Sequence, residues 1–349
     1  MKKYDAEKLL KYCSDVCMSY GLSKEAGDAV ADVLVRTDML GIFTHGVFSL
    51  KRYMEKFAAG GLNVNGVPEV VAEGPAWAIV DGHDAIGMYP AKFGLDVAVR
   101  KAKESGIAYV GVKNSSHSGA PGILAAEGAE QGMLTISVSN CPKNSTIPGT
   151  KGETFGNNPI SFAAPCKGRK HPIFMDISCS TVAGTKIRRK QEAGEKEIPA
   201  GWAVDEDGLP CTDASKKLFM TFFAGHKGYC LALLVEILSA VLSGGALINE
   251  STLWLIPENV PLTSQAFIVI DPKVMLGEGV FEERMAATAD EIVNSPKAEG
   301  TTRIFLPGDM EWERYDKAVA DGIEMPDDVS KVLEELAELT GLDLAACRK

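Results

Sequence analysis

Apolar residues recur at helical spacing near both ends of the chain. One such pattern covers residues 9–20 and stops at Gly21. Ser23 then stands where it can cap a second helix, which the spacing carries to Gly41. A third apolar periodicity covers 329–340 and is followed by another glycine. The pattern therefore predicts helices at both ends of the chain, able to pack against each other.

The middle of the chain alternates between short β-rich runs and Ala-rich helical stretches. The expected strands are 77–80, 107–112, 134–139, 173–177 and 266–270. Helical patterns at 91–105 and 122–132 separate the first of them, so we expect a mixed α/β body. The most apolar run, 228–242, contains Glu236 and is shorter than the roughly 20 residues of a membrane span. It is expected to be a buried core helix.

Composition fits a folded enzyme of about two domains. The 349 residues are 46% hydrophobic and 24% charged, with a net charge of −11. An acidic chain argues against binding to nucleic acid or to an anionic membrane surface, because both favour stripes of Lys and Arg. Eight cysteines without a Cys-x-x-Cys pair predict free, mostly buried thiols, and the charged start of the chain indicates a cytoplasmic protein.

Candidate chemistry lies with two histidines. The sequence has no Gly-x-Gly-x-x-Gly after a strand, no P-loop, no His-Glu-x-x-His and no Gly-x-Ser-x-Gly. His45 follows a helix end, and His117 follows the predicted strand 107–112, each among glycines, hydroxyls or amides. Imidazole suits proton transfer near neutral pH, so the two are candidates for an active site. The alternative, that each only stabilises its loop, is about equally well supported.

Three further segments are ambiguous. Lys227 lies at the start of the apolar helix, where it could help bind an anion or simply be solvated. The stretch 148–159 is rich in turn formers and could wrap a ligand or form an irregular connection. The basic stretch 185–197 fits a solvated loop or helix better than a phosphate clamp.

Seven segments together resemble the malate/L-lactate dehydrogenase family of the second type, which includes ureidoglycolate, sulfolactate, diketogulonate and cyclic-imine carboxylate oxidoreductases. The matching segments are 38–47, 110–119, 156–163, 175–178, 198–205, 226–229 and 306–309. Their order and spacing cover most of the chain. The resemblance implies an oxidoreductase that uses NAD or NADP and acts as a homodimer on a small molecule.

The resemblance also implies a fold and roles for individual residues. It suggests a helical domain from 1–70 plus 310–349, a mixed-sheet body from 71–120 plus 250–309, and a non-Rossmann cofactor domain at 121–249. His117 matches the family's acid/base, and His45 with Thr44 matches the residues that position the substrate oxygen. The remaining matches are cofactor contacts at Cys141, Met175, Asp176, Ile177 and Lys227, and substrate contacts at Ser49, Arg52 and Asn158.

Three positions depart from the family pattern. Leu40 replaces a frequent Arg, Thr44 replaces the usual Ser, and Ser49 replaces the Arg that binds the substrate carboxylate. Loss of that guanidinium removes a bidentate carboxylate contact, which Lys51 or Arg52 would have to replace.

The leading hypothesis is hydride transfer between NAD(P) and a small 2-hydroxy or 2-keto acid. The alternatives are a reductase of a cyclic imine or another non-standard substrate, and a nucleotide-binding protein without turnover. A metal enzyme built on His45, His117 and an acid is disfavoured, because no ligand pair has zinc-like spacing.

Overall fold

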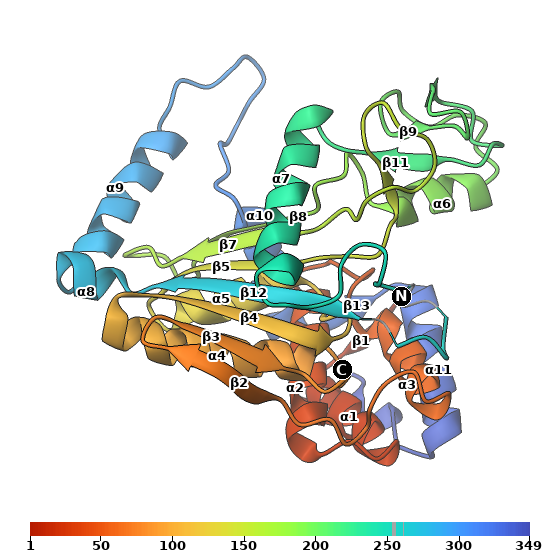
Figure 1. Cartoon of the computed structure of the whole chain (residues 1–349), viewed down its shortest axis with the longest axis horizontal. Coiled ribbons are helices and arrows are strands. Elements are labelled where there is room, and N and C mark those ends of the chain that lie inside the picture. Colours follow the sequence, from red (N-terminus) through yellow and green to blue (C-terminus); the bar gives the residue numbers. More distant parts are fainter. Residues whose placement is uncertain (253–255, 261) are drawn as a thin grey trace.

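A mixed seven-stranded sheet forms the centre of the molecule (Figure 1). The computed structural model describes residues 1–252, 256–260 and 262–349. In spatial order the strands are β2 (Glu69–Gly74), β3 (Trp77–Asp81), β4 (Ile107–Ser115), β12 (Thr263–Ile270), β5 (Leu134–Ser139), β7 (Ile160–Ala164) and β8 (Ile173–Ile177). β3 and β4 are parallel, and the other neighbouring pairs are antiparallel. The predicted mixed α/β body is confirmed.

Helices α4 (Met88–Ser105) and α5 (Pro121–Glu130) cover one face of this sheet. Alternate strand residues such as Val110 and Phe267 are fully buried there. Gly94 allows the close approach of α4, because a Cβ at this position would lie 2.6 Å from Val112 Cγ2. The strands β5, β7 and β8, which come from the segment expected to form the cofactor domain, complete this sheet.

The two chain ends pack together, as the apolar patterns predict. The helices are α1 (Ala6–Ser19), α2 (Lys24–Met39), α3 (Leu50–Ala58), α10 (Asp309–Asp321) and α11 (Asp327–Thr340), with short turns η1 (Val47–Ser49) and η3 (Ala345–Cys347). Ser23 caps α2 by accepting a hydrogen bond from the Ala26 N–H at 3.2 Å. The Tyr12 hydroxyl of α1 donates to the Leu333 carbonyl of α11, and β1 (Lys2–Tyr4) pairs with β13 (Ile323–Met325).

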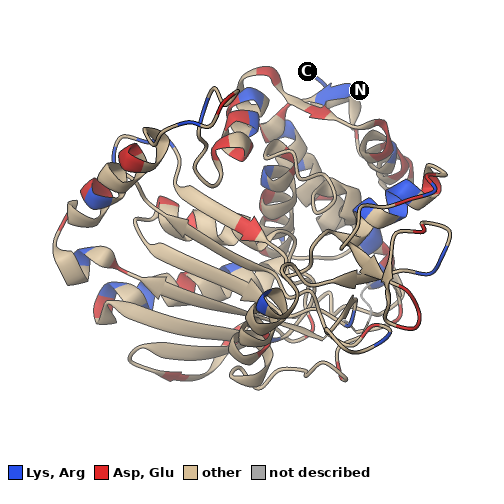
Figure 2. Ribbon diagram, turned by 90° about the horizontal axis from the view of Figure 1, so that it is seen from above, with Lys and Arg blue, Asp and Glu red and all other residues tan. Residues whose placement is uncertain are grey.

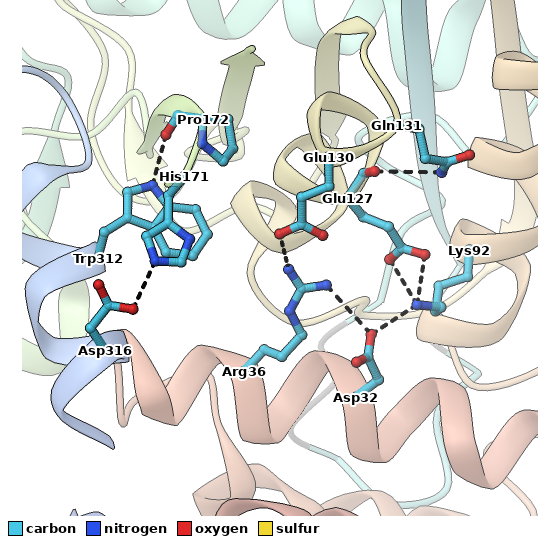
Figure 3. Close-up of polar contacts among 10 residues, drawn as sticks. All are labelled: Asp32, Arg36, Lys92, Glu127, Glu130, Gln131, His171, Pro172, Trp312 and Asp316. Carbon is cyan, nitrogen blue, oxygen red and sulfur yellow. Dashed lines mark hydrogen bonds and ion pairs between the residues drawn. The ribbon is translucent and has the colours of Figure 1, made fainter. Parts of the chain in front are cut away.

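An ion-pair network joins α2, α4 and α5 (Figure 3). Arg36, with 12% of its side chain exposed, lies 2.6 Å from Glu130 and 4.0 Å from Asp32. Lys92 of α4 lies 2.8 Å from Asp32 and 2.7 Å from Glu127. Because Arg36 is largely shielded from water, these contacts are screened less than ordinary surface pairs.

A smaller sheet lies beside the large one (Figure 1). Its strands are β10 (Pro210–Cys211), β9 (Ala203–Val204), β11 (Phe219–Thr221) and β6 (Ser145–Thr146). The basic stretch folds as α6 (Gly184–Glu192), with Lys186, Arg188 and Arg189 exposed. All eight cysteines are free and six are buried, which confirms the prediction for the thiols.

The apolar run 228–242 is not a buried core helix, contrary to the expectation. It forms α7 (His226–Glu236), which continues into a π-helical turn, η2 (Ile237–Val241). One side packs on the sheet, and Glu236 on that side is 3% exposed. The other side bears apolar residues that face solvent, because no other element of the described chain covers it. Beyond it lie α8 (Pro272–Leu276) and α9 (Val280–Val293), and no described helix is long and apolar enough to cross a membrane.

Candidate functional site

The two candidate histidines, far apart in sequence, lie side by side. His45 is in the loop between α2 and η1, and His117 is in the loop between β4 and α5. Their ring centroids are 5.8 Å apart, with 29° between the ring planes. The structure thus brings together the pair that the sequence nominated.

Buried polar contacts hold both loops. The Asp38 carboxylate at the end of α2 accepts the Val47 N–H at 2.9 Å, and a Cβ on Gly46 would lie 1.8 Å from Asp38 Oδ1. Only glycine therefore fits at position 46, directly after His45. On the other loop, Gln265 of β12 donates its Nε2–H to the Ser116 carbonyl at 2.9 Å.

Tyr53 is a residue of the site that the sequence reasoning missed. It is 1% exposed on α3, and its hydroxyl lies 2.5 Å from His117 Nδ1. The Gly119 N–H also points at this nitrogen, at 3.4 Å. Burial raises the pKa of Tyr53 far above its usual value, so the hydroxyl keeps its proton and can either donate or accept. Its position four residues after Ser49 on one helical face was the available signal.

Burial keeps both imidazoles neutral. Burial, with a smaller effect of the neighbouring His45, lowers the pKa of His117 to about 3. Burial also lowers the pKa of His45, although the negative charge of Asp176 opposes that change. The Thr44 hydroxyl lies 2.9 Å from His45 Nδ1. A neutral imidazole with a bare nitrogen can accept a proton, as a catalytic base must.

Asp176 lies close enough to His45 to affect the pKa of that imidazole. Its carboxylate accepts the Ser161 hydroxyl at 2.6 Å and the Gly122 N–H at 3.0 Å. Burial raises the pKa of Asp176, and the two hydrogen bonds and the charge of the nearby His45 oppose this rise. Met175 and Ile177, on either side of it in β8, point to the opposite face of the sheet.

The predicted substrate residues have different surroundings. Ser49 is buried in η1, where its N–H donates to the Gly46 carbonyl at 3.0 Å. Arg52 is half-buried on α3, and its charge opposes the rise in the pKa of Tyr53. Lys51 pairs with Glu335 at 2.7 Å. Arg52 is therefore the better placed of the two cations to replace the missing Arg.

Asn158 connects two predicted cofactor segments. It is fully buried, and its Oδ1 accepts the Cys141 N–H at 2.9 Å. Its Nδ2 donates to the Ala232 carbonyl at 3.0 Å and to Glu236 Oε2 at 2.9 Å, both on α7. Lys227 is exposed near the start of that helix. These contacts bind the Cys141 loop to α7, while a substrate role for Asn158 remains a prediction.

Comparison with known proteins identifies the family. The model of the malate/L-lactate dehydrogenase family matches residues 4–334. The L-sulfolactate dehydrogenase of Methanocaldococcus jannaschii is 33% identical, with 96% of each chain covered, and its solved structure superposes with a TM-score of 0.91 over 99% of each chain at 30% identity. The malate dehydrogenase of Pyrococcus horikoshii is 33% identical over 95% of this chain and 93% of its own, and its structure gives a TM-score of 0.88 over 98% and 96%.

The NAD(+)-dependent ureidoglycolate dehydrogenase of Escherichia coli K12 is 30% identical, with 95% of each chain covered. This protein therefore belongs to the malate/L-lactate dehydrogenase family. It is an oxidoreductase, and the expectation of a nicotinamide cofactor is confirmed at the level of the family.

Proposed function

We propose that this enzyme transfers a hydride between NAD(P) and a small 2-hydroxy or 2-keto acid. The observation that supports this most strongly is the buried, neutral pair of His45 and His117, with Tyr53 hydrogen-bonded to one ring and Asp176 near the other. In the oxidative direction, the unprotonated Nε2 of His117 accepts the proton of the substrate hydroxyl, while the carbon that bears this hydroxyl gives up its hydride. For this, the proton of His117 stays on Nδ1, whose N–H donates a hydrogen bond to the Tyr53 oxygen. His45 and Thr44 hold the substrate oxygen.

The chain has groups that fit a nicotinamide dinucleotide. Gln265 Oε1 is buried and lacks a hydrogen-bond partner among the described residues, although its Nε2 binds the carbonyl next to His117. This unpaired acceptor matches the donor of a carboxamide. Lys227 and the N-terminus of α7 offer positive charge to a phosphate. When bound, NAD(P) supplies or takes up the hydride.

Several finer features belong to the same proposal. The cofactor part is not a Rossmann fold: the glycine fingerprint is absent, and the large sheet is mainly antiparallel. Residues 121–249 are proposed as the cofactor domain, although their strands β5, β7 and β8 share the large sheet with the body. The enzyme works as a homodimer, and its eight free cysteines suit a reducing compartment such as the cytoplasm.

Steady-state assays at the NADH absorbance band test this function. A panel of 2-keto and 2-hydroxy acids, including malate, sulfolactate and ureidoglycolate, is offered with NAD and with NADP. His117→Ala is expected to abolish turnover of the active pair. The matched control is His83→Ala, which removes a half-exposed imidazole paired with Glu69 on the turn after β3. Unchanged turnover in His117→Ala would disprove the proposed base.

Ser49 in place of the family's Arg also fits a second class of substrate. Without the family's carboxylate-binding Arg, a cyclic imine or another non-standard substrate could occupy the same site. Turnover of a cyclic imine carboxylate with no turnover of any 2-keto acid would favour it. Binding of NADH without turnover of any substrate would instead indicate a nucleotide-binding protein.

A further inference from the structure

A small cavity lies next to the loop that carries His45. It has a volume of about 140 Å³ and is bounded by the end of α2 with the loop that follows, by α10, and by the strand pair β1–β13. None of the residues predicted to bind the substrate or the cofactor lines it. A space of this size holds about four or five water molecules at ~30 Å³ each, or one small anion.

Positive charge surrounds the cavity. Of the four exposed charged side chains that line it, Lys3, Arg314 and Lys317 are cations and Glu324 is the carboxylate. Arg314 and Lys317 are three residues apart and therefore on one side of α10. Lys3 comes from β1, the strand drawn blue beside the N-terminus in Figure 2. In a chain with a net charge of −11, these cations form a local site of the opposite sign.

The cations are available to a ligand. The ammonium groups of Lys3 and Lys317 have no ion-pair partner among the described residues, although Lys3 lies directly opposite Glu324 in the register of β1 and β13. Arg314 contacts the Glu311 carboxylate at 3.5 Å, on the same exposed surface of α10. A ligand can therefore bind these groups without breaking a buried ion pair.

The inner wall of the cavity is apolar and strengthens this positive field. Met39 and Ile323 line it and are 4% and 2% exposed. Walls of low dielectric constant strengthen the attraction of an anion by nearby cations. Burial raises the pKa of the Asp38 carboxyl well above its usual value, although the hydrogen bond from the Val47 N–H opposes the rise. A neutral Asp38 does not cancel the charge of the cations.

The cavity also contacts the loop of His45. Gly41 and Phe43 line it, and Phe43 directly precedes Thr44, whose hydroxyl lies 2.9 Å from His45 Nδ1. A Cβ on Gly41 would lie 2.8 Å from Arg314 Cδ, so the Arg314 side chain packs directly on this loop. A ligand that holds Arg314 therefore restricts the positions that the loop can adopt.

We propose that this cavity binds a phosphate group, and that the bound group stabilises one position of the loop that carries Thr44 and His45. The guanidinium of Arg314 suits two phosphate oxygens, and the ammonium groups of Lys3 and Lys317 can donate to the others. The group can come from free phosphate or from a small phosphate monoester, which present the same charged oxygens. The effect on catalysis rests on the proposed function, whereas phosphate binding does not.

The experiment measures binding and activity on the same samples of the full chain. Inorganic phosphate and glycerol 3-phosphate are titrated by calorimetry, at an ionic strength kept constant with NaCl. The cavity variant combines Lys3→Gln and Lys317→Gln. The matched control combines Lys103→Gln and Lys331→Gln, which removes the same charge from two exposed lysines on α4 and α11, outside the cavity. Circular dichroism checks the fold of each.

We expect one phosphate to bind per chain in the wild type and in the control. The cavity variant should bind it about 10–100-fold more weakly, because two charge-assisted contacts are lost. Saturating phosphate should lower the KM of the wild type for its substrate by about fivefold, leave the dissociation constant of NADH within about twofold, and change neither in the cavity variant. Tighter binding of glycerol 3-phosphate than of phosphate would identify a monoester as the ligand, and the reverse order would identify the free ion.

Two results would overturn the site: no saturable binding of phosphate to the wild type, or equal binding to the cavity variant. In the second case, competition with NADH would place the ion at the cofactor site instead. Phosphate binding that leaves KM unchanged would overturn the link to His45. If the wild type turns over no substrate, the proposed function fails, and calorimetry still decides whether this cavity binds phosphate.

Discussion

Replacing Tyr53 by Phe tests whether the hydroxyl at 2.5 Å from His117 Nδ1 selects the tautomer of the base. With Tyr53 as acceptor, Nδ1 carries the proton and Nε2 stays bare. Without it, the Gly119 N–H, 3.4 Å from Nδ1, favours a bare Nδ1 and moves the proton to Nε2. The imidazole is then a donor where the reaction needs an acceptor.

The magnitude follows from the burial of the contact. Leaving a buried polar group without its hydrogen-bond partner costs about 1–3 kcal/mol, and each 1.36 kcal/mol changes a rate about tenfold. Tyr53→Phe should therefore lower kcat for alcohol oxidation by about 10–100-fold while the dissociation constant of NADH stays within about twofold. The acidic limb of the pH profile should move lower, because the acceptor for the His117 cation is lost.

The assay is the initial rate of NADH formation across pH, with fluorescence titration of NADH on the same samples. Tyr12→Phe is the matched control, since it removes a buried hydroxyl that bonds the Leu333 carbonyl at 3.3 Å, far from the site. It should lower stability and leave kcat unchanged. If Tyr53→Phe oxidises substrate as fast as the wild type, Tyr53 does not act through the tautomer of His117.

Three further outcomes are expected. Gly46→Ala places a Cβ 1.8 Å from Asp38 Oδ1, so initial rates should fall at least tenfold in a chain whose circular dichroism is retained. Arg36→Met leaves Glu130, whose side chain is 41% exposed, without its ion pair and should cost about 1 kcal/mol in urea unfolding; an unchanged unfolding free energy would show that the pair contributes nothing to stability. The pKa of His117 is about 3 in the folded chain and near 6.5 in the unfolded chain. Between pH 3 and 6.5 the unfolded chain therefore binds more protons, and the free energy of unfolding falls as the pH drops through this range. His117→Gln should flatten this dependence on pH in urea titrations.

Local signals were sufficient for helices α1, α2, α4, α5 and α11 and for five strands of the large sheet, whereas α3, α9, α10, β2 and β7 were not predicted. Ser23 and the glycines after α1 and α11 marked helix ends because capping depends on a few neighbouring residues. Strands β5 and β8 have the expected bounds, because short β-rich runs between turn formers have few alternatives. The His45 and His117 loops were nominated for the same local reason.

The sequence could not show what depends on long-range contacts. Tyr53 shares a helical face with Ser49, but only the tertiary arrangement brings its hydroxyl to His117. The exposure of α7 was missed because an apolar run is predicted to be buried without regard to which molecule buries it. Periodicity shows which side of a helix is apolar, but not whether its cover lies in the same chain.

Contacts of the neighbouring cations decide which of them can replace the missing carboxylate-binding Arg. Lys51 is held outward by Glu335 at 2.7 Å and Glu55 at 3.8 Å, which removes it as a replacement. Arg52 remains, three residues after Ser49 and thus about one turn further along the same side of α3. Of the two cations, Arg52 is therefore the one that we propose to bind the substrate carboxylate.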